Sequence, residues 1–142
     1  MTAQSPNQFY GDFFMDKKER LRIFGTNIAK LLKANEGSFV IFEEKVYHKY
    51  VQFAGSKEAS GWFIIDIPLI ELSKDEEKRL LSLNEFSKCH RSRDIKSNEP
   101  ISFQIHYTQE DVQKAAQLTE EIFIEVFKLA PDYNFKVELI LT

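Results

Sequence analysis

The side chains best suited to chemistry gather in one polar stretch, residues 87–100, which reads SKCHRSRDIKSNEP. Four cations and one carboxylate between positions 88 and 96 give a local charge of +3, although the whole chain has a formal net charge of -3. Such cations can hold a phosphate, RNA or an acidic peptide. The alternative is a solvated loop without a ligand. The candidate anion-binding residues are Lys88, His90, Arg91 and Arg93.

No other pattern in the sequence indicates catalysis or metal binding. Cys89 directly precedes His90, and adjacent side chains rarely form the pair that a Cys–His mechanism requires. His48 and His106 are distant in the sequence, and no His-x-x-x-His or Cys-x-x-Cys pair is present. The five glycines form no phosphate-binding loop. We therefore predict no catalytic residues, no metal site and no cofactor, and we expect that the protein is not an enzyme.

Length and composition restrict the class of protein. A chain of 142 residues with 13 phenylalanines can bury the core of one domain. One cysteine allows no intramolecular disulfide, which favours a reducing, cytoplasmic location. We see neither a secretory signal nor an apolar run of the roughly 20 residues that span a membrane, so we expect no membrane association. The acidic average argues against a dedicated nucleic-acid partner.

The elements that would position these side chains begin with a helix predicted over Asp16–Asn35. Asp16 is a candidate N-cap, with Glu19 three residues further on. The apolar stripe at helical spacing comprises Leu21, Phe24, Ile28, Leu31 and Leu32. The basic residues that we place mostly off this stripe are Lys17, Lys18, Arg20 and Lys30.

A two-residue periodicity then predicts strands. Ser38–Glu43 and Val46–Ala54 are separated by only two residues, which indicates a hairpin, and Trp62–Ile67 follows as a third strand. Asp66 is unusual in this apolar segment. It fits the solvent face or an edge, and a buried catalytic carboxylate is the less favoured alternative.

The second half of the chain repeats this pattern of helices and strands. Ser73 and Glu76 form a capping box for a short helix over Ser73–Phe86. After the polar loop, Ile101–Tyr107 alternates as a strand with apolar residues on one face and Ser102, Gln104 and His106 on the other. Thr108, with Asp111 in the box position, begins the last long helix. Positions 135–141 alternate again as the terminal strand.

The predicted order is therefore α-β-β-β-α-β-α-β. We expect an α+β fold in which two main helices and one short helix pack on an antiparallel sheet of about five strands. Residues 1–12 are predicted to be a flexible N-terminal segment, and residues 13–142 a single domain. The aromatic residues at positions 9, 10, 13 and 14 are expected to pack partly on that domain or on a partner.

Three segments carry a resemblance to a known family. They read YVQFA (Tyr50–Ala54), IELSKDEEKRLLSLNEF (Ile70–Phe86) and TQEDVQKAAQLTEEIFIEVFKL (Thr108–Leu129). Together with the element order, they resemble small domains with a type III secretion chaperone-like fold, which include the YbjN-like proteins and related uncharacterised cyanobacterial proteins. The resemblance covers Asp16 to Thr142 and implies an α+β domain that often dimerises and, in the secretion chaperones, binds an unfolded client. It implies no catalytic residues.

The polar face of the predicted sheet is the candidate partner surface, because exposed edges and amphipathic aromatic residues favour interfaces. The candidate partner-binding residues are Tyr47, Tyr50, Trp62, Gln104 and His106. We predict a non-enzymatic, chaperone- or adaptor-like protein that binds a protein or peptide client and forms a homodimer. The first alternative is a small-ligand or phosphate-binding protein, an enzyme included, that uses the basic residues 88–96. A nucleic-acid regulator is a third reading.

Overall fold

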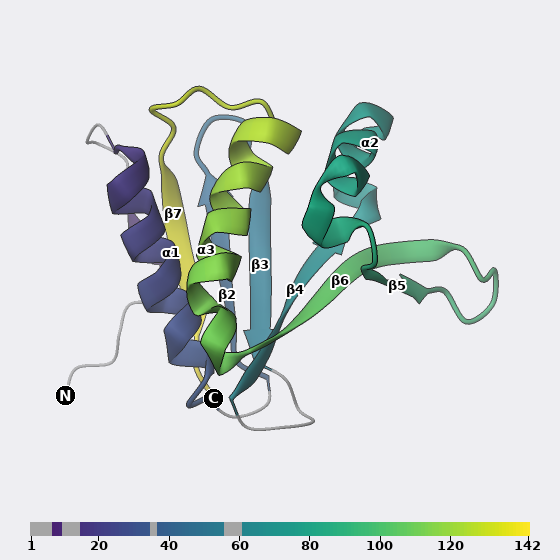
Figure 1. Cartoon of the computed structure of the whole chain (residues 1–142), viewed down its shortest axis with the longest axis horizontal. Coiled ribbons are helices and arrows are strands. Elements are labelled where there is room, and N and C mark those ends of the chain that lie inside the picture. The colour runs from purple at the N-terminus through teal and green to yellow at the C-terminus, as the bar shows by residue number, and fades with distance from the viewer. Residues whose placement is uncertain (1–6, 10–14, 35–36, 56–60) are drawn as a thin grey trace.

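The computed structural model describes residues 7–9, 15–34, 37–55 and 61–142 (Figure 1). Its described strands form one seven-stranded sheet in the order β1-β7-β2-β3-β4-β6-β5, and every neighbouring pair is antiparallel. The strands are β1 Asn7–Phe9, β2 Phe39–Glu44, β3 Tyr50–Gly55, β4 Trp62–Pro68, β5 His90–Arg93, β6 Pro100–Thr108 and β7 Phe135–Ile140. The α-helices are α1 Lys17–Leu31, α2 Lys74–Ser82 and α3 Val112–Glu121.

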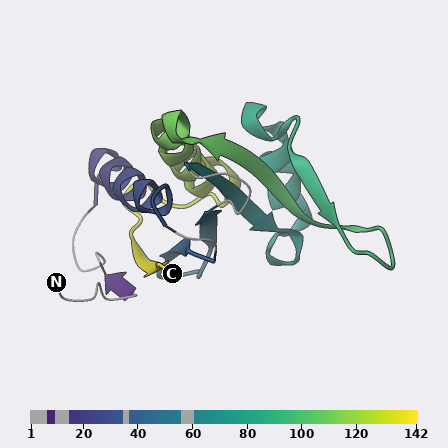
Figure 2. The ribbon, with the colours of Figure 1, turned by 90° about the horizontal axis from the view of Figure 1, so that it is seen from below.

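The two long helices cover one face of the sheet. Figure 1 shows α1 and α3 next to each other over β7, β2 and β3, and Figure 2 shows both on the same side of these strands. The short helix α2 contacts the chain that continues from the C-terminal end of α3. The predicted α+β class with an antiparallel sheet is confirmed, and β1 and β5 join the sheet in addition to the five strands expected.

Alternating burial shows which face of the sheet carries the core. Buried and half-buried residues alternate along β2 and β7, and β4 differs only in its exposed first residue. The strand β6 departs from this pattern, because Ser102 and Phe103 are both buried while Ile101 is 50% exposed. The pairing of β5 with β6 shifts register between Ser92 and Arg93, and such an irregularity bends a strand and redirects its side chains.

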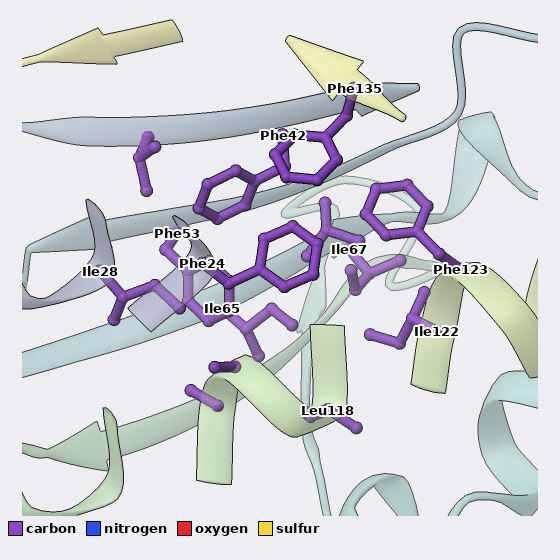
Figure 3. Close-up of a cluster of buried hydrophobic side chains, with 14 of the residues drawn as sticks. Phe24, Ile28, Phe42, Phe53, Ile65, Ile67, Leu118, Ile122, Phe123 and Phe135 are labelled. Carbon is purple, nitrogen blue, oxygen red and sulfur yellow. The ribbon is translucent and has the colours of Figure 1, made fainter. Parts of the chain in front are cut away.

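Aromatic rings fill the space between the helices and the sheet (Figure 3). Phe24 of α1 lies at the centre of this core and is 0% exposed. Its ring centroid lies 4.8 Å from that of Phe42 and 4.7 Å from that of Phe135. Phe123 continues the stack at 6.1 Å. Edge-to-face and offset pairs of this kind contribute beyond their buried area, so α1 is joined to β2 and β7 through one aromatic cluster.

The three predicted N-caps are confirmed by hydrogen bonds. The Asp16 carboxylate accepts from the backbone N–H of Glu19 at 2.9 Å. Ser73 and Glu76 form a reciprocal capping box that begins α2. The Thr108 N–H and hydroxyl both donate to the Asp111 carboxylate.

The last helix is less regular than predicted. A 3-10 turn, Gln109–Asp111, precedes α3, and a π-helical turn, Ile122–Val126, follows it. The Phe127 N–H donates to the Ile122 carbonyl at 3.0 Å, the i→i+5 bond of a π turn. The Arg79 side chain of α2 donates to the Val126 carbonyl at 2.9 Å, so α2 helps to satisfy this irregular end.

The first hairpin differs from its predicted boundaries. The prediction of a two-residue turn followed by a strand from Val46 is wrong, because β3 begins at Tyr50 and a longer turn precedes it. The carboxylate of Glu44 is buried there and accepts from the N–H groups of Val46 and Tyr47 at 2.8 and 2.7 Å. His48 has a φ of 60°, in the left-handed region, which closes the turn without glycine.

The N-terminal segment predicted to be flexible is described only in part. Asn7–Phe9 form β1, which pairs with β7. Residues 1–6 and 10–14, which include three of the four aromatic residues expected to pack, lie outside the described residues.

The aromatic cluster predicts a large effect of truncating its central ring. Replacing Phe24 with Ala should lower the free energy of unfolding by about 3–5 kcal/mol, because the cavity left among rigid rings cannot collapse. Urea denaturation followed by circular dichroism measures the change. The control is Ile70→Ala at a residue that is 91% exposed, and this variant should stay within about 0.5 kcal/mol of the parent. Equal stabilities of the two variants would contradict the packing described for Phe24.

Candidate functional site

The basic stretch that we expected to be a loop contains the edge strand β5, His90–Arg93. Its residues pair with β6 as His90↔Gln104, Arg91↔Phe103 and Ser92↔Ser102. In the described part of the chain no strand pairs with the other side of β5. Figure 1 shows the β5–β6 hairpin projecting beyond the helices. An edge of this kind presents backbone N–H and C=O groups that a further strand can pair with.

The turn of the hairpin is held by Asp94. Its carboxylate accepts from the N–H groups of Lys96 and Ser97 at 2.7 and 3.0 Å, and these bonds hold the pKa of the Asp94 carboxyl below its usual value. The Asp94 N–H donates to the Glu99 carbonyl at 2.9 Å. Asn98 adopts a φ of 60°, which asparagine tolerates better than most residues. Asp94, the one acid between positions 88 and 96, is thus engaged in hydrogen bonds within the turn.

The cations along β5 have no ionic partners in the described part of the chain. Lys88, Arg91, Arg93 and Lys96 are all exposed, and none forms an ion pair with a carboxylate among the residues that the structure describes. Arg91 lies with its guanidinium 5.4 Å from the centroid of the Phe103 ring, which orients the side chain without neutralising it. Arg93 donates to the Asn98 carbonyl at 3.0 Å. The edge therefore carries fixed, uncompensated positive charge.

The structure brings the candidate anion-binding residues onto one strand but not into one pocket. His90 lies opposite Gln104 on the face of the sheet away from the helices, whereas Arg91 lies on the opposite face with Phe103. Lys88 precedes the strand, and Cys89 packs partly against the core. A strand alternates its side chains, so these residues cannot converge on a single phosphate as a loop would allow.

Most of the candidate partner-binding residues share the outer face of the sheet. Alternation places Tyr50, Trp62, Gln104 and His106 there, and Trp62 is 43% exposed. Tyr47 lies apart in the β2–β3 turn and is 70% exposed.

Asp66, the unusual acid of β4, also lies on this outer face. Its carboxylate accepts from the side-chain amides of Gln52 at 2.9 Å and Gln104 at 2.8 Å. It is therefore a half-buried acceptor that links β3, β4 and β6, as expected for a solvent-face residue. Gln104 is also the partner of His90 in the pairing of β6 with β5. The candidate partner-binding residues and the candidate anion-binding residues are therefore adjacent at this edge of the sheet.

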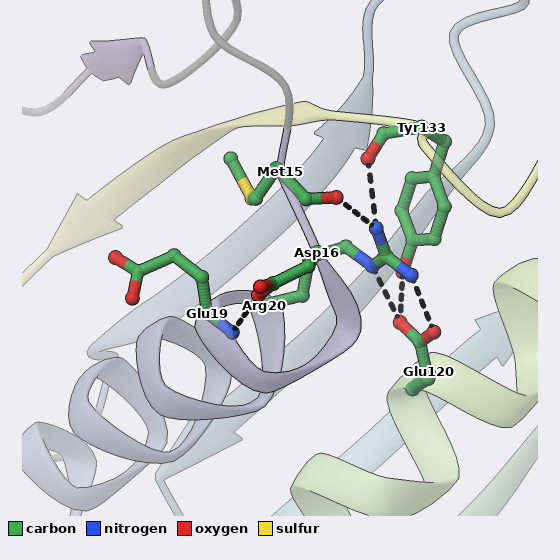
Figure 4. Close-up of polar contacts among 6 residues, drawn as sticks. All are labelled: Met15, Asp16, Glu19, Arg20, Glu120 and Tyr133. Atoms are coloured by element: carbon green, nitrogen blue, oxygen red, sulfur yellow. Dashed lines mark hydrogen bonds and ion pairs between the residues drawn. The ribbon is translucent and has the colours of Figure 1, made fainter.

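A buried ion pair is the feature that sequence reasoning missed (Figure 4). The prediction that Arg20 lies mostly off the apolar stripe of α1 is wrong, since the residue is 1% exposed. Its guanidinium donates twice to the Glu120 carboxylate, at 2.8 and 2.7 Å, and also to the carbonyls of Met15 and Tyr133. The Tyr133 hydroxyl donates to Glu120 at 2.8 Å. The sequence did carry a signal for this burial, because Arg20 lies four residues before Phe24 and therefore on the same face of α1.

Contacts within this cluster decide the protonation of its members. Burial alone would lower the pKa of the Arg20 guanidinium, but its contacts with Glu120 and Tyr133 outweigh burial and raise it. Burial, together with the charge of Glu120, raises the pKa of the Tyr133 hydroxyl well above its usual value. The cluster thus contains a charged guanidinium and a neutral tyrosine, and both oxygens of the Glu120 carboxylate accept hydrogen bonds.

The chain matches no protein-family model, no curated protein and no solved structure. The resemblance to the secretion chaperone-like family stays a prediction from its motifs. Among the described residues, no group of three or more His, Cys, Asp or Glu side chains is placed to hold a metal ion. None of the described helices has the length and apolar character needed to cross a bilayer.

The ion pair predicts a strong effect of neutralising one partner. Glu120→Gln should lower the free energy of unfolding by about 3–5 kcal/mol, because it leaves the Arg20 charge buried without a counter-charge. The double variant Arg20→Met/Glu120→Leu should lose less than the sum of its two single variants, since it removes both charges. Urea denaturation is measured for the parent, for Glu120→Gln, and for the double variant together with its single variants Arg20→Met and Glu120→Leu. Glu110→Gln at an exposed position is the control, and additive losses would show that the pair does not act as a unit.

The raised pKa of Tyr133 predicts a pH dependence with a definite sign. Above pH ~10 an unfolded tyrosine loses its proton while the folded one keeps it, so the free energy of unfolding falls with pH from this residue, with a limiting slope of about 1.4 kcal/mol per pH unit. Tyr133→Phe should remove that part of the slope between pH 10 and 11. Tyr47→Phe, in an exposed turn, should leave the slope unchanged. Urea titrations across this range make the test, and parallel curves for Tyr133→Phe and the parent would refute it.

Proposed function

We propose that this protein is a non-enzymatic binding module that captures an extended, acidic segment of a partner protein, which adds to the sheet alongside β5. One observation carries the proposal: an edge strand with a free side bears exposed cations that have no ionic partners in the described residues. Strand addition gives affinity through main-chain hydrogen bonds and specificity through alternate side chains. Acidic side chains on the incoming segment would neutralise Arg91 and Arg93 on one face.

The shape of the edge favours a peptide over a small anion. The side chains of Lys88, His90, Arg91 and Arg93 are all exposed and alternate between two faces. A small phosphate needs donors that converge and exclude water. An extended chain, in contrast, meets both faces of an edge strand along its length. The phosphate-binding alternative, an enzyme included, would require these side chains to gather after ligand binding.

A chaperone- or adaptor-like role in the cytoplasm is part of the proposal, and so is a homodimer. Two copies pairing through β5 would place arginines of one strand close to arginines of the other, and like charges across a ladder are destabilising. The proposed dimer therefore uses a different surface from β5. The outer face, where Phe39, Ile64 and Trp62 contribute apolar area, is the candidate.

A selection experiment tests the proposed partner chemistry. A random octapeptide library displayed on phage is selected against the full chain, and we expect enrichment of Asp and Glu and depletion of Pro. Proline is depleted because it cannot donate to the ladder. Selected peptides without acidic enrichment, or with frequent proline, would contradict strand addition at β5.

Charge-reversal variants locate the binding site. Arg91→Glu/Arg93→Glu should weaken binding of a selected peptide at least about tenfold in fluorescence anisotropy, because it replaces attraction with repulsion at the contact. The control Lys18→Glu/Lys114→Glu makes the same change in net charge at exposed positions near the helix N-termini, where acidic residues are tolerated. Equal losses in both variants would show that only the overall charge matters.

A further inference from the structure

A groove opens between α1 and α3 at one end of the helix pair. The helices approach closely at Gly25, where a Cβ atom would lie 3.2 Å from the side-chain nitrogen of Gln113. Towards the N-terminal end of α1 they separate, as Figure 1 shows. A cavity of about 690 Å³ lies there, and the Arg20–Glu120 pair is among its lining residues. This volume is within the range of about 300–1,000 Å³ that small-molecule sites occupy.

The walls of the groove combine apolar surface with acidic groups. Leu21 of α1, Ile124 of the π turn and Pro131 of the following loop supply the apolar part. The described lining also contains four carboxylates and two cations, a formal balance of -2. Arg20 and Glu120 neutralise each other, and their hydrogen bonds are satisfied within the protein. The acidic excess therefore belongs to the other lining residues, Asp16, Glu121 and Glu125 against Lys17. Lys128, outside this lining, lies 3.9 Å from the Glu125 carboxylate, and both side chains are exposed.

Glu121 is the least compensated of these acids. It is half-buried, and no cation forms an ion pair with it among the described residues. Burial and the neighbouring carboxylates of Glu85 and Glu125 raise the pKa of its side chain. A positive charge in the groove would relieve this repulsion. Ile124 and Glu125 belong to a π-helical turn, a feature that occurs often at functional sites.

We propose that the groove between α1 and α3 binds a small molecule that has an apolar body and one cationic group, of the alkylamine class. The apolar body contacts Leu21, Ile124 and Pro131, and the ammonium group lies between Glu121 and Glu125. Charge complementarity excludes carboxylate ligands of the same shape. The site is independent of β5, because it has the opposite charge and lies on different elements, so each binding activity can fail without the other.

Titrations with matched eight-carbon probes test the site. Octylamine, which is protonated at neutral pH, is added to the ¹⁵N-labelled full chain, and amide shifts are followed by NMR. We expect saturable shifts around Leu21, Gln117 and Ile124. Octanoate should produce no such shifts because it carries the wrong charge, and ethylamine none because it lacks the apolar body. Equal binding of octanoate, or octylamine shifts confined to other surfaces, would overturn the proposal.

Two double variants separate the groove from general acidity. Glu121→Gln/Glu125→Gln should weaken octylamine binding at least about tenfold, whereas Glu99→Gln/Glu110→Gln, with the same loss of charge at exposed positions, should not. Thermal unfolding confirms that both variants fold. Unchanged affinity in the groove variant would overturn the proposal. Binding of a basic amphipathic peptide helix at these residues without any octylamine binding would also overturn it, since the groove would then be a protein interface.

Discussion

The bidentate contact between Arg20 and Glu120 is the constraint on which the arrangement of the helices depends. It joins α1 to α3, two helices whose contacting residues are 100 positions apart in the chain. The same guanidinium also reaches the carbonyl of Tyr133, which precedes β7. A buried charge without its partner is strongly unfavourable, so other registers of α1 on α3 would leave both groups uncompensated. The pair therefore selects one packing of the helices, while the aromatic core beneath it contributes the bulk of the stabilisation.

Local patterns predicted the regular parts of the fold well because local physics determines them. The caps at Asp16, Ser73 and Thr108 depend on residues three positions apart, and all three hydrogen bonds are present. Alternation located β2, β4 and β7 because each has one buried face. In β5 the sequence HRSR has no apolar alternation, since both faces are largely exposed, and only pairing with β6 makes it a strand. The three residues of β1, NQF, are too few to show any alternation.

The candidate sites show a further limit of local reasoning. Composition identified the cations at positions 88–96 but not their geometry, because a loop and an edge strand have the same sequence requirements when neither face is buried. The strand changes the chemistry: it separates His90 from Arg91 and exposes a backbone edge. The groove could not be predicted from the sequence for a different reason, since its walls come from α1, α3 and the loop at Pro131. No spacing rule joins residues that only tertiary packing brings together.

The mild average charge of the chain conceals two surfaces of opposite sign. Cations without ion-pair partners among the described residues lie along β5, and the lining of the groove carries an excess of carboxylates, of which Glu125 also pairs with Lys128 at 3.9 Å. These two charges offset each other in part in the net charge but not in the local field. Charge that is segregated in this way orients an approaching ion before contact. It also makes self-association through either surface alone unfavourable, because each would meet its own sign. The two surfaces lie on different elements, and this separation would allow one small domain to present the two proposed binding chemistries.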